Sequence, residues 1–105
     1  MAKKVADPAA RTIVATETPK HSFELGKCYF VRTVTYHYTG RLVSVTESDL
    51  VLDEAAWIAD SGRFSNAIAT GSLSEVEPYP GKVILSRGAI VDACEWNHML
   101  PRTVN

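Results

Sequence analysis

The chain has 105 residues, which is enough for one domain and too few for two. Its 11 basic and 12 acidic residues give a net charge of -1, which excludes a broadly basic nucleic-acid-binding surface. No apolar run reaches the length of a membrane span or a secretory signal, so we expect a cytoplasmic protein without a membrane partner. In a reducing compartment, Cys28 and Cys94 are expected to be free, buried thiols.

Residues 1–22 predict an N-terminal arm outside the folded domain. This stretch carries prolines and basic side chains without a hydrophobic period. Such a segment cannot bury enough apolar surface to offset the entropy lost on ordering, so we expect it to be flexible. The folded domain is then expected over residues 23–100, followed by a short C-terminal tail over residues 101–105.

The folded region predicts five short β-strands. Aromatic and β-branched residues dominate them, and these side chains suit a pleated, half-buried surface. Polar turn formers at 46–49 separate the second strand from the third, and a tight turn at Arg87-Gly88 separates the last two. The strands are expected at 28–38, 41–45, 50–58, 82–86 and 89–96.

A longer connection, residues 59–81, joins the third and fourth predicted strands. It contains apolar residues at helical spacing, which predict one short helix with Ser65 as its N-cap and Gly71 as its stop. Pro78 and Pro80 flank Tyr79 and predict a loop before the fourth strand.

Two glycines are expected to have structural roles in turns and bends. Gly40 suits a barrel corner where backbones crowd and a Cβ would not fit. Gly88 suits a turn that needs positive φ.

Five short strands with tight connections predict an all-β fold, a small barrel or sandwich. A sheet of this size has a small core and exposed edges, and bare edges are sites for unwanted pairing. Edge-to-edge pairing between identical copies would cover the edges, and a head-to-tail interface closes into a ring where its rotation allows.

Two segments resemble the paired motifs of a known family. In residues 40–55, a glycine and a leucine open a bent strand, and a polar turn leads into Leu50-Val51-Leu52 and an acidic residue. In residues 83–91, a hydrophobic strand leads to Arg87-Gly88 and then to a β-branched residue. Together they resemble the Sm-like proteins (the Sm, LSm and Hfq superfamily), above all those encoded by bacteriophages.

The resemblance implies a strongly bent, five-stranded antiparallel barrel that assembles into a homo-oligomeric ring of about five to seven subunits. It also implies loops at the central pore that bind single-stranded RNA through Ser48, Asp49, Arg87 and Gly88. A salt bridge between Arg87 and Asp49 that fixes the two loops is the alternative for these side chains. For a bacteriophage protein, the expected location is the cytoplasm of the host cell.

Two departures from the family pattern favour a different function for the ring. Asp49 stands where the family usually has asparagine, and the stacking position near Glu47 holds no aromatic residue. Stacking contributes about 1–3 kcal/mol per base in sequence-tolerant binding of single strands, and acidic loops repel phosphates. The alternative is therefore a structural or adaptor ring, in a phage particle or on a host factor, that does not bind RNA.

The aromatic residues allow two interpretations. Tyr29, Phe30, Tyr36 and Tyr38 are either a platform for base stacking or ordinary packing on the two faces of a strand. We expect packing, and we expect Trp57 and Trp96 to be core or interface anchors.

Catalytic and metal-binding patterns are weak in this sequence. Cys94, Glu95 and His98 are close in sequence, but adjacent strand residues point to opposite faces. No paired-cysteine or histidine spacing indicates a metal site. We therefore expect a protein that is not an enzyme, has no cofactor or metal, and takes no small-molecule substrate.

Overall fold

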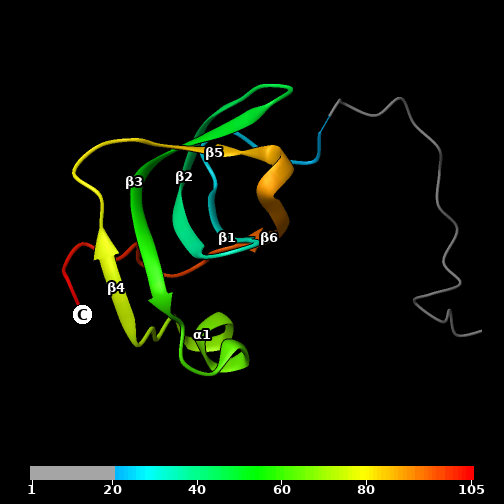
Figure 1. The fold of residues 1–105 in the computed structure, drawn as a ribbon. Coiled ribbons are helices and arrows are strands. Elements are labelled where there is room, and N and C mark those ends of the chain that lie inside the picture. The colour runs from blue at the N-terminus through cyan, green and yellow to red at the C-terminus, as the bar shows by residue number, and fades with distance from the viewer. Residues whose placement is uncertain (1–20) are drawn as a thin grey trace, which may run out of the picture.

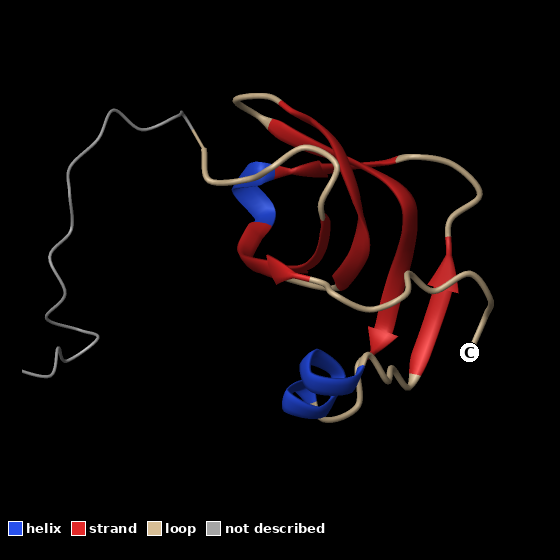
Figure 2. Cartoon of the chain, turned by 180° about the vertical axis from the view of Figure 1, so that it is seen from behind, coloured by secondary structure: helices blue, strands red, loops and turns tan. Residues whose placement is uncertain are grey.

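The computed structural model describes residues 21–105, and these form one antiparallel β-sheet with one short helix (Figures 1 and 2). The 3-10 turn η2 (Arg87–Ala89) joins the last two strands. The other elements are β1 (Cys28–Thr33), β2 (His37–Val45), β3 (Asp49–Asp60), α1 (Phe64–Thr70), β4 (Glu75–Pro78), β5 (Val83–Ser86) and β6 (Ile90–Glu95). The predicted all-β antiparallel class is confirmed, but the sheet is open and has six strands, so the predicted number of five is wrong.

Strand β3 organises the sheet because it has different neighbours along its two halves. The strand order is β4-β3-β2-β1-β6, and β5 also pairs with β3. The first part of β3, from Asp49 to Leu52, pairs with β5, whereas the part from Ala56 to Asp60 pairs with β4. Figure 1 shows β5 and β4 at the two ends of β3.

The sheet must curl strongly because β5 and β6 lie on opposite sides of the β1-β2-β3 unit, yet only η2 joins them. In a flat sheet, these two strands would be about 19 Å apart. A 3-10 turn rises only about 2 Å per residue, so three residues cannot cross that gap. The curvature therefore brings the two ends of the sheet toward each other.

Two β-bulges between β2 and β3 accompany this curvature. Thr39 pairs with Ala56 and Arg41 with Asp53, so β3 has one extra residue there. Glu54 lies in this bulge with a φ of 49°, which is unusual for a residue with a side chain. A second register shift between Leu42 and Ser44 places an extra residue in β2. Bulges bend the strand that carries them and increase its twist.

Gly40 lies opposite the first bulge and close against β3. A Cβ at Gly40 would be 2.8 Å from the Leu52 Cβ and 3.2 Å from the Asp53 carbonyl oxygen. Only glycine therefore fits without moving β3.

We expect Gly40→Ala to lower the free energy of unfolding by about 1–3 kcal/mol, because the added methyl group overpacks the β2–β3 contact. Urea denaturation followed by far-UV circular dichroism measures this change. Gly81→Ala is the matched control, because nothing lies within 4 Å of a Cβ at Gly81. Equal stability of the two variants would show that Gly40 does not hold the bend.

Two hydrophobic clusters lie on the two faces of the sheet, and alternate residues of β1 point into each. Phe30 belongs to the first, together with Ala56, Ile58, Ala67, Leu73, Val76, Trp96 and Leu100. Tyr29 and Val31 belong to the second, together with Leu42, Leu50, Leu52, Ala55 and Leu85. The prediction that the aromatic residues of the first strand pack on both faces is therefore confirmed for Tyr29 and Phe30.

The two cysteines are free thiols beside the first cluster, and both are half-buried rather than buried as expected. Burial raises the pKa of the Cys94 thiol, with a smaller contribution from the Asp92 carboxylate.

Helix α1 confirms the short helix and its predicted stop but not its predicted start. Gly71 adopts a φ of 79°, and its N–H donates to the Ala67 carbonyl at 2.8 Å. The N-cap is Arg63, which makes no side-chain capping hydrogen bond, so the expectation of Ser65 as N-cap is wrong. Ala67 is the residue that anchors the helix in the first cluster.

Strand β4 was not expected, and the C-terminal residues explain how it is held. Val76 is buried against the first cluster. The N–H of Val76 donates to the Asn105 carbonyl at 3.0 Å, and the N–H of Asn105 donates to the Val76 carbonyl at 2.9 Å. Arg102 also forms an ion pair with Glu54 in β3. The tail thus covers the outer edge of β4.

Candidate functional site

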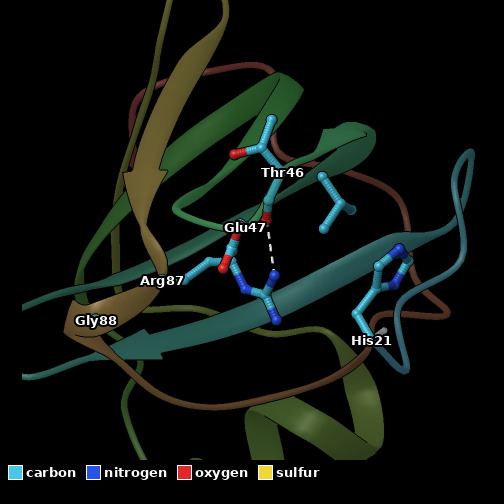
Figure 3. A pocket seen from close by; sticks show the side chains of 6 residues that line it. His21, Thr46, Glu47, Arg87 and Gly88 are labelled. Carbon is cyan, nitrogen blue, oxygen red and sulfur yellow. Dashed lines mark hydrogen bonds between the residues drawn. The ribbon is translucent and has the colours of Figure 1, made fainter. Parts of the chain in front are cut away.

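Two loops that are distant in sequence meet beside one end of β5. The backbone N–H of Arg87 donates to the Ser48 carbonyl at 2.9 Å, and Asp49 pairs with Ser86 across β3 and β5. The Arg87 guanidinium donates through Nη1 to the Thr46 carbonyl at 2.7 Å (Figure 3). The structure therefore brings together the loops that carry Ser48, Asp49, Arg87 and Gly88.

The Asp49 carboxylate is engaged within its own hairpin loop. The Thr46 hydroxyl donates to Asp49 Oδ1 at 3.0 Å and accepts from the Asp49 N–H at 3.0 Å. Threonine commonly makes such local bonds at turns. Within residues 21–105, no ion pair joins Arg87 to Asp49, so the predicted salt bridge between the loops is wrong.

Gly88 differs from its predicted role. Gly88 lies inside the 3-10 turn Arg87–Ala89, which the Ile90 N–H closes by donating to the Arg87 carbonyl. Gly88 is not among the glycines with positive φ, so the expectation of a left-handed turn is wrong. A Cβ at Gly88 would meet only the Ser86 Oγ, at an ordinary distance of 3.7 Å. The turn geometry therefore does not require glycine at this position.

An open hollow lies between these loops and the first described residues. Figure 3 shows the Arg87 guanidinium pointing into it, between the hairpin loop and His21. Its lining residues are His21, Val45, Thr46, Glu47, Arg87 and Gly88. Neither Arg87 nor Glu47 forms an ion pair within the described part of the chain. The hollow thus presents one cationic and one anionic side chain.

His21 is the lining residue that sequence reasoning missed, because it falls in the segment assigned to the arm. Its place is set by its neighbours: the Phe23 ring meets the Tyr29 ring edge-on, with centroids 5.5 Å apart. The Glu24 N–H also donates to the Tyr29 hydroxyl at 2.9 Å. A tyrosine in β1 therefore fixes the chain that precedes it, and no local sequence signal reveals this contact.

The hollow offers polar hydrogen-bonding groups rather than a platform for a stacked base. Arg87 uses one nitrogen on Thr46 and keeps further N–H donors for an acceptor such as a base edge or a phosphate oxygen. The Glu47 carboxylate lines the same hollow and would repel a phosphate there. No Phe, Tyr or Trp is among the described lining residues, and His21 is the one ring there.

Within residues 21–105, the two strands that η2 connects both have an uncovered edge. Strand β5 pairs with β3 on one side, and β6 pairs with β1 on one side. Ile84 in β5 is 69% exposed and Val91 in β6 is 60% exposed. Large aliphatic side chains on open edge strands are typical of surfaces that bind another chain.

The charges on β6 are neutralised within the sheet. Asp92 forms an ion pair with Arg32, and Glu95 with Lys27, both in or beside β1. The hydrogen bonds from Arg32 hold the pKa of Asp92 below its usual value. Because these carboxylates already have partners, they do not protect the β6 edge as unpaired charges would.

The residues considered for catalysis do not form one site. His98 Nε2 lies 2.7 Å from the Ile68 carbonyl in α1, and the His98 ring meets Trp96 edge-on at 4.7 Å. Cys94 packs at the first cluster, beside β1. Among residues 21–105, no three His, Cys, Asp or Glu side chains are grouped to hold a metal ion. No helix in the same range is long and apolar enough to cross a membrane.

Comparison of the chain with models of protein families, with curated proteins and with solved structures found no match. The proposed function therefore rests on the edges of β5 and β6 and on the hollow at Arg87.

Proposed function

We propose that this chain is the subunit of an Sm-like homo-oligomeric ring of about five to seven copies, in which β5 of one copy pairs with β6 of the next. The single observation that supports this most directly is the pair of open edges, each with an exposed aliphatic side chain, Ile84 and Val91.

The distribution of covered and uncovered edges favours this arrangement. The tail covers β4 through its two hydrogen bonds between Val76 and Asn105. Strand β5, Val83–Ser86, contains no charged residue that would oppose pairing. The edges that remain in the described part of the chain, β5 and β6, differ from each other, so their pairing is head-to-tail and repeats from copy to copy.

The curvature of the sheet also supports the Sm-like barrel. Strands β6 and β5 lie at the two ends of the order β6-β1-β2-β3-β5, and only a three-residue turn joins them. The sheet must therefore bend toward a barrel. In the proposed ring, that turn and the Thr46–Asp49 hairpin of every copy lie together at the pore.

A second element of the proposal is that the hollow at Arg87 binds single-stranded RNA. The specific observation is that the Arg87 guanidinium points into the hollow without a carboxylate partner in the described residues. An adaptor ring without RNA binding is the competing function, and the Glu47 carboxylate in the hollow favours it.

We expect Arg87→Ala to weaken binding of labelled U-rich or A-rich oligonucleotides about tenfold at low salt, where phosphate contacts are strongest. Fluorescence anisotropy measures the affinity. Arg63→Ala is the matched control, because it removes the same charge from an exposed position away from the hollow. If the wild-type ring does not bind either oligonucleotide at low salt, the adaptor function replaces RNA binding.

A further inference from the structure

An aromatic face lies on β2, β3 and β4, on elements that the proposed ring contacts do not use. Tyr38 pairs with Trp57, and Trp57 pairs with Glu77, so these three side chains are cross-strand neighbours on one face. Tyr36 precedes Tyr38 by two residues, and Tyr79 follows Glu77 by two. Tyr36 and Tyr79 lie just outside these strands, and the contacts of their rings with Trp57 and Tyr38 place them beside the same face. We call Tyr36, Tyr38, Trp57 and Tyr79 the aromatic face.

The rings of the aromatic face contact one another. The Tyr36 and Trp57 rings meet edge-on with centroids 5.1 Å apart, and the Tyr38 and Tyr79 rings stack at 6.4 Å. Tyr38 also packs against the second hydrophobic cluster, which holds the face from below. The rings therefore pack in pairs rather than standing alone.

This surface is open to solvent. Tyr36 is 49% exposed and Tyr79 is 38% exposed, while Tyr38 and Trp57 are half-buried. The Tyr36 hydroxyl and the Trp57 indole N–H make no hydrogen bond with another residue of the 21–105 region. Exposed rings with free donors are the usual composition of binding hot spots.

The β4 side of the aromatic face is acidic, whereas Arg102, which lines a pocket with Tyr79, is paired with Glu54. Glu77 and Glu75 lie on β4 and are exposed, and neither forms an ion pair within the described chain. Glu77 is the direct cross-strand neighbour of Trp57. This charge opposes the phosphates of a nucleic acid and favours a cationic partner.

We infer that the aromatic face binds a proline-rich protein segment that carries an arginine or a lysine. In the polyproline II conformation, such a segment has no internal hydrogen bonds, so its carbonyls accept from donors such as the Trp57 indole and the Tyr36 hydroxyl. Its proline rings lie on aromatic side chains, and the cation pairs with Glu77. This inference does not depend on the ring, because the face contains no residue of β5 or β6.

Titration of the full chain with a proline-rich peptide that contains one arginine tests the inference. Binding changes the fluorescence of the half-buried Trp57 and leaves Trp96, which is 3% exposed, as an internal reference. Trp57→Phe assigns the signal. We expect Tyr79→Ala to weaken binding about tenfold or more, as loss of an interface aromatic does. Phe64→Ala is the matched control, since Phe64 is 45% exposed and packs on Phe30 in the other cluster.

Glu77→Gln provides a second variant that keeps the shape of the exposed side chain, and it should weaken the arginine peptide but not the same peptide with alanine for arginine. Three results would overturn the inference: no saturable binding by the wild-type chain, preferential binding of an oligonucleotide that Tyr79→Ala abolishes, or self-association that Tyr79→Ala abolishes without any peptide binding. Failure of the ring is recognised separately, because it changes the mass of the particle and not the peptide titration.

Discussion

Ile84→Glu and Val91→Glu should each dissociate the assembled protein into monomers, and a mixture of the two variants should form heterodimers and nothing larger. In a head-to-tail contact, each variant loses one edge and keeps the other. The intact β6 of Ile84→Glu then pairs with the intact β5 of Val91→Glu, and both remaining edges carry a carboxylate. Burial of an unpaired charge costs at least about 3 kcal/mol, or roughly a hundredfold in association.

Size-exclusion chromatography with light scattering distinguishes the possible outcomes. Leu25→Glu is the matched control, because Leu25 is 64% exposed in the segment before β1 and should leave the assembly unchanged. Assembly of a single variant into dimers would indicate an isologous contact between identical edges, which contradicts the proposed pairing. Assembly of the mixture into full-size particles would contradict it equally.

Trp96→Ala should lower the free energy of unfolding by about 3–5 kcal/mol, which is the largest loss of stability that we expect from one side chain. Trp96 is 3% exposed and stacks on Phe30 at 5.6 Å. Its indole N–H donates to the Met99 carbonyl at 3.2 Å, and its ring also contacts His98, which bonds α1. The substitution therefore removes the ring that packs the chain after β6 against Phe30 and against His98, which bonds α1.

The measurement is best made in the Ile84→Glu background, because assembly would otherwise add concentration-dependent stability. Urea denaturation followed by far-UV circular dichroism gives the difference. Trp57→Ala is the matched comparison and should cost less, since Trp57 is half-buried. A loss at Trp96 no larger than the loss at Trp57 would show that the first cluster does not depend on this ring.

The strands that could be predicted are those whose own residues show the aromatic, β-branched or apolar pattern of a strand. The apolar run at β3 forms a strand, and Gly71 ends α1 as its position indicates. The predicted first strand over 28–38 is wrong in its bounds, because a bend at 34–36 divides it into β1 and the start of β2. Strand β4 could not be predicted because its four residues include a proline and two glutamates. They show no hydrophobic alternation that would indicate a strand. Its pairing with β3 and with Asn105 is non-local, so no window of sequence contains it.

The candidate site was predicted in part. The resemblance to two motifs was enough to place Arg87 beside the Thr46–Asp49 loop, and the backbone contact between Arg87 and Ser48 is present. The partner of Asp49 was missed because the Thr46 hydroxyl, three residues away, competes with the Arg87 guanidinium for the carboxylate. The local hydrogen bond is the one that forms. The RNA-binding role of these residues remains a prediction.

The mass of the purified full-length particle, measured by multi-angle light scattering, tests the central claim most directly. Pairing of the open β5 and β6 edges predicts a closed ring, and the Sm-like resemblance implies a particle of about five to seven times the mass of a single chain, unchanged on moderate dilution. A stable particle with the mass of one chain would contradict the edge pairing and, with it, the proposed ring.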